Sequence, residues 1–203
     1  MAAERKEPSY CRSCHAAFWQ GVFQAETAYL ERHLRGCRKV LSVGCGPANI
    51  EGNLLCAGFD LTGLDVSREA LAGAPEGLRT MIGRAEKLPF VENSFDAVVF
   101  IASLQFVEDY RQALAEAARV LRPGGKVIAL LLNPKSPFYR ERRANPNSYV
   151  RHIKAAGVED ILAAAEGRFS VQDEYFLGIR GETVYESRDP SEAAIYAIRG
   201  IVR

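Results

Sequence analysis

Short apolar runs, separated by segments of helical periodicity, fill the middle of the chain. The runs have the length and composition of buried strands. They cover residues 39–43, 61–64, 78–82, 95–101 and 127–132. Helices are predicted between them at residues 48–57 and 108–121. Strands that alternate with helices need crossover connections, so the pattern predicts an α/β fold with a parallel sheet.

Both ends of the chain extend this alternation. Residues 13–35 repeat apolar side chains at three- and four-residue steps, which indicates an amphipathic helix before the first strand. Two helices and two strands are predicted after the fifth strand. They are residues 148–156 and 159–166 for the helices, and residues 169–179 and 192–202 for the strands. No repeat, low-complexity tract or linker divides the chain, so a single domain is expected.

A glycine turn follows the first strand directly. Gly44 and Gly46 let a ligand approach the backbone, and the helix that follows offers free N–H groups. The second strand ends on Asp65, 19 residues after Gly46, where a carboxylate accepts hydrogen bonds from ribose hydroxyls. Asn49 stands where dinucleotide-binding folds carry a third glycine. The pattern therefore predicts an adenosine-containing ligand and speaks against a dinucleotide.

Four segments in this order resemble the class I S-adenosylmethionine-dependent methyltransferases, in particular the small-molecule branch similar to ubiquinone and menaquinone methyltransferases. The segments are LSVGCGPAN, GLDVS, GRAEKLPFVENSFDAVVF and EAARVLRPGGKVIAL, and the resemblance is strong over residues 39–133. It implies a Rossmann-like, doubly wound, seven-stranded and mostly parallel sheet with helices on both faces and an antiparallel C-terminal strand. The division implied is an N-terminal helical cap segment at residues 1–38 and a cofactor-binding domain at residues 39–203.

The same resemblance implies the activity and the cofactor. A methyl group would move from the sulfonium of S-adenosylmethionine to a nucleophile on a small molecule, leaving S-adenosylhomocysteine, with no metal required. The residues expected around the cofactor are Tyr10, Trp19, Gly44, Cys45, Gly46, Asp65, Val66, Ala85, Glu86, Ile101 and Ser103. One departure stands out. Arg84 occupies a position where the family usually has an aspartate near the adenine amino group.

No catalytic residue is identified on the acceptor side. Gln105 and Phe106 follow the fourth strand, where many relatives carry a histidine, and Tyr139 belongs to a predicted loop after the fifth strand. These three are the acceptor-side candidates. His33 and His152 are interpreted as surface or helix-packing residues rather than catalysts. The sequence therefore provides no obvious base, which a thiol, amine or phenolate acceptor does not need.

Composition narrows the partners. Hydrophobic residues make up 48% of the 203 residues, charged residues 25%, and the net charge is +1, which argues against a nucleic-acid substrate. No apolar run reaches the roughly 18 residues of a membrane span, and the N-terminus lacks the apolar stretch of a signal peptide. A cytoplasmic monomer or homodimer acting on a small molecule is expected.

One further motif remains open. Cys11, Cys14 and His15 form C-x-x-C-H, which matches a haem-attachment site, but no export signal accompanies it. A zinc site needs further ligands, for which Cys37 and His33 are the near candidates. Coincidence is the expectation, and a metal or thiol-redox role is the alternative.

Two other functions compete with methyl transfer. One is a non-catalytic protein of the same fold that binds S-adenosylmethionine or S-adenosylhomocysteine, which the missing base and Arg84 keep open. The other is a dinucleotide-dependent oxidoreductase, against which Asn49 argues. The first predicts cofactor binding without methyl transfer, and the second predicts binding of NAD.

Overall fold

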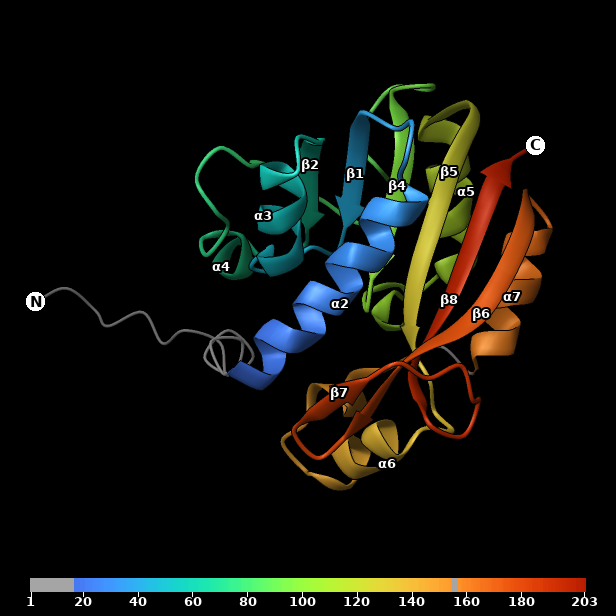
Figure 1. Ribbon diagram of the computed structural model, residues 1–203. Helices are drawn as coiled ribbons and strands as arrows, with labels where there is room; N and C mark the ends of the chain where they lie inside the picture. Colours follow the sequence, from blue (N-terminus) through green and yellow to red (C-terminus); the bar gives the residue numbers. More distant parts are fainter. Residues whose placement is uncertain (1–16, 155–156) are drawn as a thin grey trace, which may run out of the picture.

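The computed structural model describes residues 17–154 and 157–203, and the strands of these residues form one mixed sheet (Figure 1). The order across the sheet is β3-β2-β1-β4-β5-β8-β6-β7. The strands are β1 (Lys39–Val43), β2 (Asp60–Asp65), β3 (Arg79–Ile82), β4 (Phe95–Ile101), β5 (Leu121–Leu132), β6 (Phe169–Arg180), β7 (Thr183–Tyr185) and β8 (Ala193–Val202). The first five pair in parallel, and β8 runs antiparallel to both β5 and β6.

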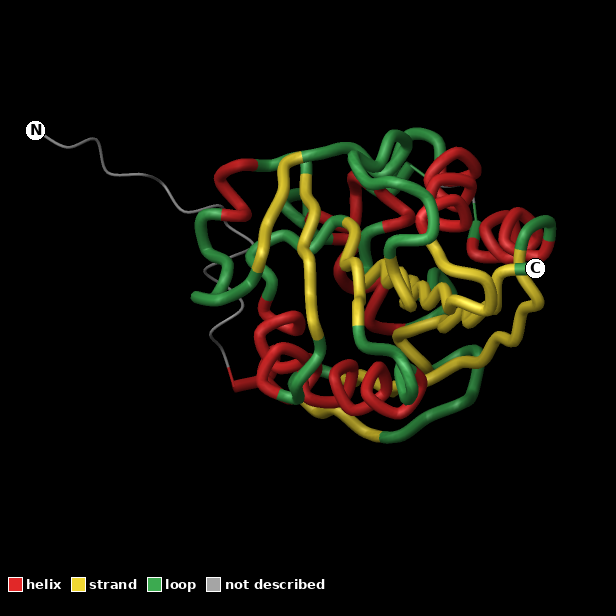
Figure 2. The backbone as a smooth tube through the Cα atoms, turned by 90° about the horizontal axis from the view of Figure 1, so that it is seen from above, coloured by secondary structure: helices red, strands yellow, loops and turns green. Residues whose placement is uncertain are grey.

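Helices cover both faces of this sheet (Figures 1 and 2). The α-helices are α2 (Ala17–His33), α3 (Asn49–Cys56), α4 (Arg68–Leu71), α5 (Tyr110–Val120), α6 (Pro137–Ala144) and α7 (Val158–Glu166), with 3₁₀ turns η1 (Leu104–Phe106) and η2 (Tyr149–His152). One hydrophobic core joins α2, α3 and α6 to the sheet, and a second joins α5 and α7 to the opposite face. The alternation within β4 shows this division, since Val99 enters the first core and Phe100 the second.

The strand order reverses between β1 and β4. From β1 the chain winds outward to β2 and β3, then returns to place β4 on the other side of β1. In open sheets of this kind, ligands bind at the carboxyl ends of the strands beside such a reversal, because the two connections leave in opposite directions and open a crevice. The topology therefore predicts a ligand-binding site at the carboxyl ends of β1 and β4.

The seven-stranded α/β sheet predicted from the sequence is confirmed, with one strand more than expected. The addition is β7, which pairs with β6 at the edge after a turn at Gly181. Its three residues, between Gly181 and a polar loop, carry too little apolar periodicity to be recognised. The fifth strand also begins earlier, since Leu121 pairs with Phe95 and the register then shifts before Ala97.

Two predictions for the segment after β5 are wrong. Tyr139 was expected in a loop, but Pro137–Ala144 forms α6, because Ser136 Oγ accepts the N–H of Tyr139 at 3.1 Å and Pro137 occupies the first turn. A helix was expected from residue 148, but only η2 forms. It ends because Ile153 is extended and Lys154 donates its N–H to the carbonyl of Gln105 instead, at 2.9 Å.

None of the helices in the described ranges is both long and apolar enough to cross a membrane.

Candidate functional site

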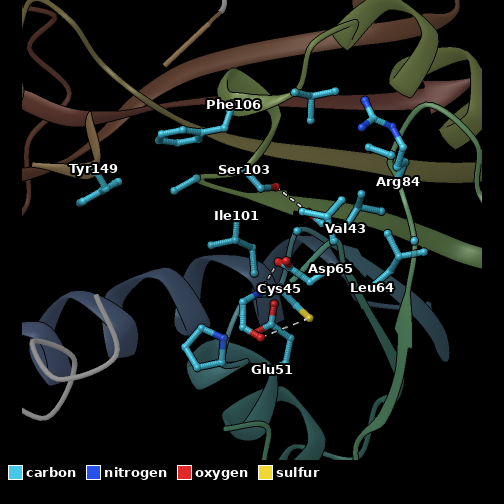
Figure 3. Close-up of a pocket in the computed structure, with 18 of the residues that line it drawn as sticks. Val43, Cys45, Glu51, Leu64, Asp65, Arg84, Ile101, Ser103, Phe106 and Tyr149 are labelled. Atoms are coloured by element: carbon cyan, nitrogen blue, oxygen red, sulfur yellow. Dashed lines mark hydrogen bonds between the residues drawn. The ribbon is translucent and has the colours of Figure 1, made fainter. Parts of the chain in front are cut away.

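A cavity of about 480 Å³ lies at the carboxyl ends of β1, β2, β3 and β4 (Figure 3). Its volume is within the range of small-molecule sites. It brings together most of the residues expected from the sequence. Those that line it are Gly44, Cys45, Gly46, Asp65, Val66, Ala85, Glu86, Ile101, Ser103 and Phe106. The strand reversal therefore assembles residues that are up to 62 positions apart in the chain, from Gly44 to Phe106.

The turn after β1 is shaped to press against the end of β4. Gly44 has φ +74°, and a Cβ atom there would lie 2.5 Å from Cβ of Ser103. Ser103 Oγ in turn donates a hydrogen bond to the carbonyl of Val43 at 2.5 Å. Ala102, beside it, also has a positive φ of 47°. A non-glycine residue with such a φ carries strain, and strain of this kind gathers at binding sites.

Asp65 ties the glycine turn to the end of β2. Its Oδ2 accepts the N–H of Gly46 and its Oδ1 the N–H of Ser67, each at 2.8 Å. A carboxylate has about four acceptor positions, two on each oxygen. The two backbone bonds use one position on each oxygen of Asp65, so the other one on each is left for a ligand. The sequence predicted a carboxylate facing ribose, and the structure adds that the same group fixes the backbone of the turn.

The β3 end of the cavity carries both apolar and charged groups. Val66 lines the cavity with 65% of its surface exposed, which is unusual for a valine, and Ala85 is buried nearby. Arg84 Nη2 lies 3.0 Å from Glu86 Oε1, and the Arg84 side chain is 62% exposed. Arg84 therefore sits at the rim with its charge paired, and it supplies donors where the resembled family has an acceptor.

Two buried carboxyl groups lie beneath the turn, and the sequence interpretation overlooked both. Glu51 on α3 is 3% exposed and lines the cavity, and Glu26 on α2 is 4% exposed. Burial raises the pKa of Glu51 to about 7, although the Ser42 hydroxyl, which donates to its Oε1 at 2.5 Å, acts in the opposite direction. Burial raises the pKa of Glu26 to about 8, and the nearby Glu51 adds to the effect.

These carboxyl groups make the stability of the fold depend on pH. A carboxyl group whose pKa is raised in the folded state stabilises the fold below its unfolded pKa, near 4.5, and this contribution is lost as pH rises through the folded pKa. We expect the free energy of unfolding of Glu26→Gln, measured relative to the wild type, to rise by about 2–4 kcal/mol between pH 5 and pH 8. Urea denaturation at both pH values measures this difference. The exposed Glu31 on the same helix provides the control variant Glu31→Gln, which should show no such change, and equal behaviour of the two variants would contradict the argument.

The β4 side of the cavity is aromatic. The rings of Phe106 and Tyr149 are stacked with centroids 5.9 Å apart, and His152, an exposed residue of the same 3₁₀ turn as Tyr149, also lines the cavity. Glu108 and Lys154 form an ion pair there, which links the chain after η1 to the chain after η2. In Figure 3 the aromatic pair lies on the far side of Ile101 and Ser103 from Glu51. This wall is apolar, with one imidazole and one ion pair.

Comparison with known proteins identifies the family. A family model described as a methyltransferase domain matches residues 41–129. A demethylmenaquinone methyltransferase of Listeria monocytogenes serotype 4a is 33% identical over 164 residues, which cover 74% of this chain and 68% of that protein. The chain belongs to the class I S-adenosylmethionine-dependent methyltransferases.

Two further relatives define how far the likeness extends. A demethylmenaquinone methyltransferase of Corynebacterium glutamicum is 34% identical over 108 residues, which cover 52% of this chain and 47% of that protein. The matched part is thus about half the length of that relative. A crystal structure from Thermotoga maritima, titled as an S-adenosylmethionine-dependent methyltransferase and possible histamine N-methyltransferase, aligns with a TM-score of 0.80 at 23% identity. It covers 96% of this chain and 94% of that one, which shows that the methyltransferase fold is shared.

Three residues expected at the site do not line the cavity. Gln105 is buried, and its amide exchanges two hydrogen bonds with the backbone of Leu132, at 3.0 and 2.7 Å, so it holds η1 against β5 rather than facing a ligand. Tyr139 is buried in the core on α6. Trp19 packs against Phe23 and Phe138. Phe23 lines the cavity, whereas Trp19 and Phe138 do not.

The remaining expectations concern the N-terminal segment. Tyr10 and the C-x-x-C-H residues Cys11, Cys14 and His15 lie outside the described residues. Of the two further ligands considered for a metal, Cys37 approaches the carbonyl of Asp96 and His33 contacts Arg199. Within residues 17–154 and 157–203, no three His, Cys, Asp or Glu side chains gather as a metal site would require.

The cavity and its surroundings also contain residues that the sequence interpretation did not place there. Ser42 interrupts the apolar first strand, and a buried hydroxyl needs a partner, which here is Glu51. His152 was interpreted as a surface or packing residue, and it is exposed, but it also lines the cavity. No local signal could have revealed its position, because η2 is brought there by the bond between Lys154 and Gln105.

Proposed function

We propose that the chain transfers a methyl group from S-adenosylmethionine to a nucleophile on a small molecule bound against Phe106, Tyr149 and His152. The observation that carries the proposal is the order of chemical groups along the carboxyl ends of the strands. Arg84–Glu86 follow β3, Asp65 and Val66 lie at the end of β2, the glycine turn follows β1, and Ile101–Ser103 lie at the end of β4. Four neighbouring strands span about 14 Å, so the cavity suits an elongated ligand.

The residues present fit the cofactor. The glycine turn has no room for a Cβ atom at Gly44, so backbone alone faces the ligand there. Asp65 keeps two acceptor positions for the two ribose hydroxyls, and the exposed Val66 offers an apolar surface for the adenine ring. S-adenosylmethionine supplies an activated methyl group on a positively charged sulfonium when it is bound.

The contribution of the protein is then mainly one of position. Gly44, Asp65 and Ile101 would hold the cofactor so that its methyl group faces the aromatic wall, and the stacked rings would hold a flat acceptor in line behind that carbon. Alignment of this kind lowers barriers by up to about 7–11 kcal/mol in favourable systems. The imidazole of His152 can accept a proton from a hydroxyl acceptor as the new bond forms.

The proposed function is tested by transfer of labelled methyl groups. The protein, labelled S-adenosylmethionine and a short-chain demethylmenaquinol form the first assay, because two relatives are named for that class of substrate. A metabolite extract is the second. Label recovered in a small molecule supports the proposal. Tight cofactor binding with no label transferred to either pool would favour the non-catalytic protein of the same fold.

The role of His152 can be separated from simple packing once an acceptor is found. We expect His152→Asn to lower kcat by roughly 10²-fold for a hydroxyl acceptor, in line with general base catalysis, while the Kd for S-adenosylmethionine stays unchanged. His33→Asn, the same change at a histidine that contacts Arg199 away from the cavity, is the control. An unchanged kcat in His152→Asn would exclude this histidine as the base.

A further inference from the structure

The carboxyl groups of Glu51 and Glu26 are buried where few groups of the protein would stabilise a negative charge on them. Both are buried, and the charged groups of the described residues that raise their pKa values are acids: Glu51 acts on Glu26, and Asp65 acts on Glu51. The hydroxyl of Ser42 and the backbone N–H of Glu51 are the partners that favour ionisation of Glu51. An ionised, buried Glu51 that has only these two partners is unfavourable, so its carboxyl group keeps its proton.

We propose that Glu51, with Glu26 behind it, recognises the positive charge at the amino-acid end of the cofactor and releases one proton when that charge binds. This inference rests on the proposed function, because it concerns the same ligand. It adds a recognition residue on α3, outside the glycine turn and Asp65, and it couples cofactor binding to pH.

The position of Glu51 carries the argument. It lies in the first turn of α3, shortly after the glycine turn, and it lines the cavity while Glu26 lies behind it on α2. In Figure 3 Asp65 lies between Glu51 and Arg84. A ligand that gives its ribose to Asp65 and its adenine to the β3 side must therefore direct its remaining end toward the turn and Glu51.

Charge determines what that end must be. A cation that enters the cavity beside Glu51 compensates the carboxylate, so the proton leaves and a charge-assisted hydrogen bond replaces it. An uncharged ligand end would leave Glu51 protonated. Glu26 keeps its proton, since burial raises its pKa and a second ionised group so close to Glu51 would be repelled. The site thus selects ligands with an ammonium or sulfonium group over neutral adenosine derivatives.

Calorimetry at pH 6.5 in phosphate and in Bis-Tris tests the inference, because the two buffers take up released protons with different enthalpies. S-adenosylhomocysteine carries an ammonium group but no sulfonium, and methylthioadenosine carries neither. We expect S-adenosylhomocysteine to release roughly 0.5–1 proton, and S-adenosylmethionine the same number if the ammonium is the group recognised. Methylthioadenosine should release almost none. Release with S-adenosylmethionine but not with S-adenosylhomocysteine would overturn the inference, because the recognised charge would then be the sulfonium and not the ammonium.

A variant of Glu51 tests whether this residue is the source of the released proton. We expect Glu51→Gln to remove the proton release and to weaken S-adenosylhomocysteine binding by about 10–100-fold, with methylthioadenosine affinity changed less than about threefold. The exposed Glu31 on α2 gives the control Glu31→Gln, which should behave as the wild type. If Glu51→Gln does not fold, the comparison of the two ligands on the wild type still decides.

The possible results distinguish a failure of this inference about Glu51 from a failure of the proposed methyltransferase function. S-adenosylhomocysteine bound without proton release, or bound no better than methylthioadenosine, would overturn the inference and leave the methyltransferase function standing. Failure of S-adenosylmethionine and S-adenosylhomocysteine to bind at all would overturn both. Proton release that persists in Glu51→Gln would assign the proton to another group and also overturn the inference.

Discussion

Gly44→Ala is expected to damage both the fold and cofactor binding. Alanine at φ +74° costs about 1–2 kcal/mol, and a Cβ atom 2.5 Å from Ser103 adds about 1–3 kcal/mol of overpacking. The free energy of unfolding should therefore fall by about 2–5 kcal/mol. The affinity for S-adenosylmethionine should fall more than tenfold, since the turn moves away from the end of β4. Urea denaturation and calorimetric titration measure the two effects.

The matched control for this change is Gly124→Ala. Gly124 has nearly the same φ, +75°, but a Cβ atom there meets nothing within 4 Å. This variant should lose about 1–2 kcal/mol of stability from backbone strain alone and should bind the cofactor as the wild type does. If Gly44→Ala and Gly124→Ala behave alike, the contact between the glycine turn and Ser103 has no special importance.

Asp65→Ala is expected to weaken S-adenosylmethionine binding by about 1.5–3 kcal/mol, roughly 10–150-fold. The carboxylate would lose its bonds to the ribose, and the N–H groups of Gly46 and Ser67 would lose their acceptor. Both losses act in the same direction, because the second loosens the turn that holds the rest of the cofactor. Isothermal titration of the folded variant gives the affinity.

Asp60→Ala provides the comparison on the same strand. Asp60 begins β2, at the opposite end from Asp65, and pairs with Arg79 on the surface. Its removal should change the affinity for the cofactor by less than about twofold, since exposed ion pairs contribute little. An unchanged affinity in Asp65→Ala would remove this carboxylate from the site and with it the predicted ribose contact.

Much of the fold and part of the site followed from local sequence signals. The strands of the parallel half are short apolar runs between turns, and the two glycines and Asp65 stand at strand ends that the topology must bring to one edge. The cavity around Gly44, Gly46 and Asp65 was predictable for this reason. Their distance in sequence did not matter, because the carboxyl ends of parallel strands always share an edge.

What could not be predicted depends on contacts between distant segments. Gln105 follows a strand end, as a site residue does, but its amide is taken up by Leu132. Glu51 looks like an exposed helix residue until α2 covers it with Glu26. His152 reaches the cavity because the chain after η2 is bonded to η1. In each case a partner far along the chain decides where the side chain lies. Trp19 does not line the cavity and Tyr10 lies outside the described residues, so the cofactor contacts expected for them stay predictions.

The most direct test of the central claim is a parallel calorimetric titration of the purified protein with S-adenosylmethionine, S-adenosylhomocysteine and NAD. The cavity at the ends of β1–β4 predicts micromolar binding of the first two and no binding of NAD, because Asn49 stands where a dinucleotide site has its third glycine. Binding of NAD alone, or of none of the three, would contradict the account.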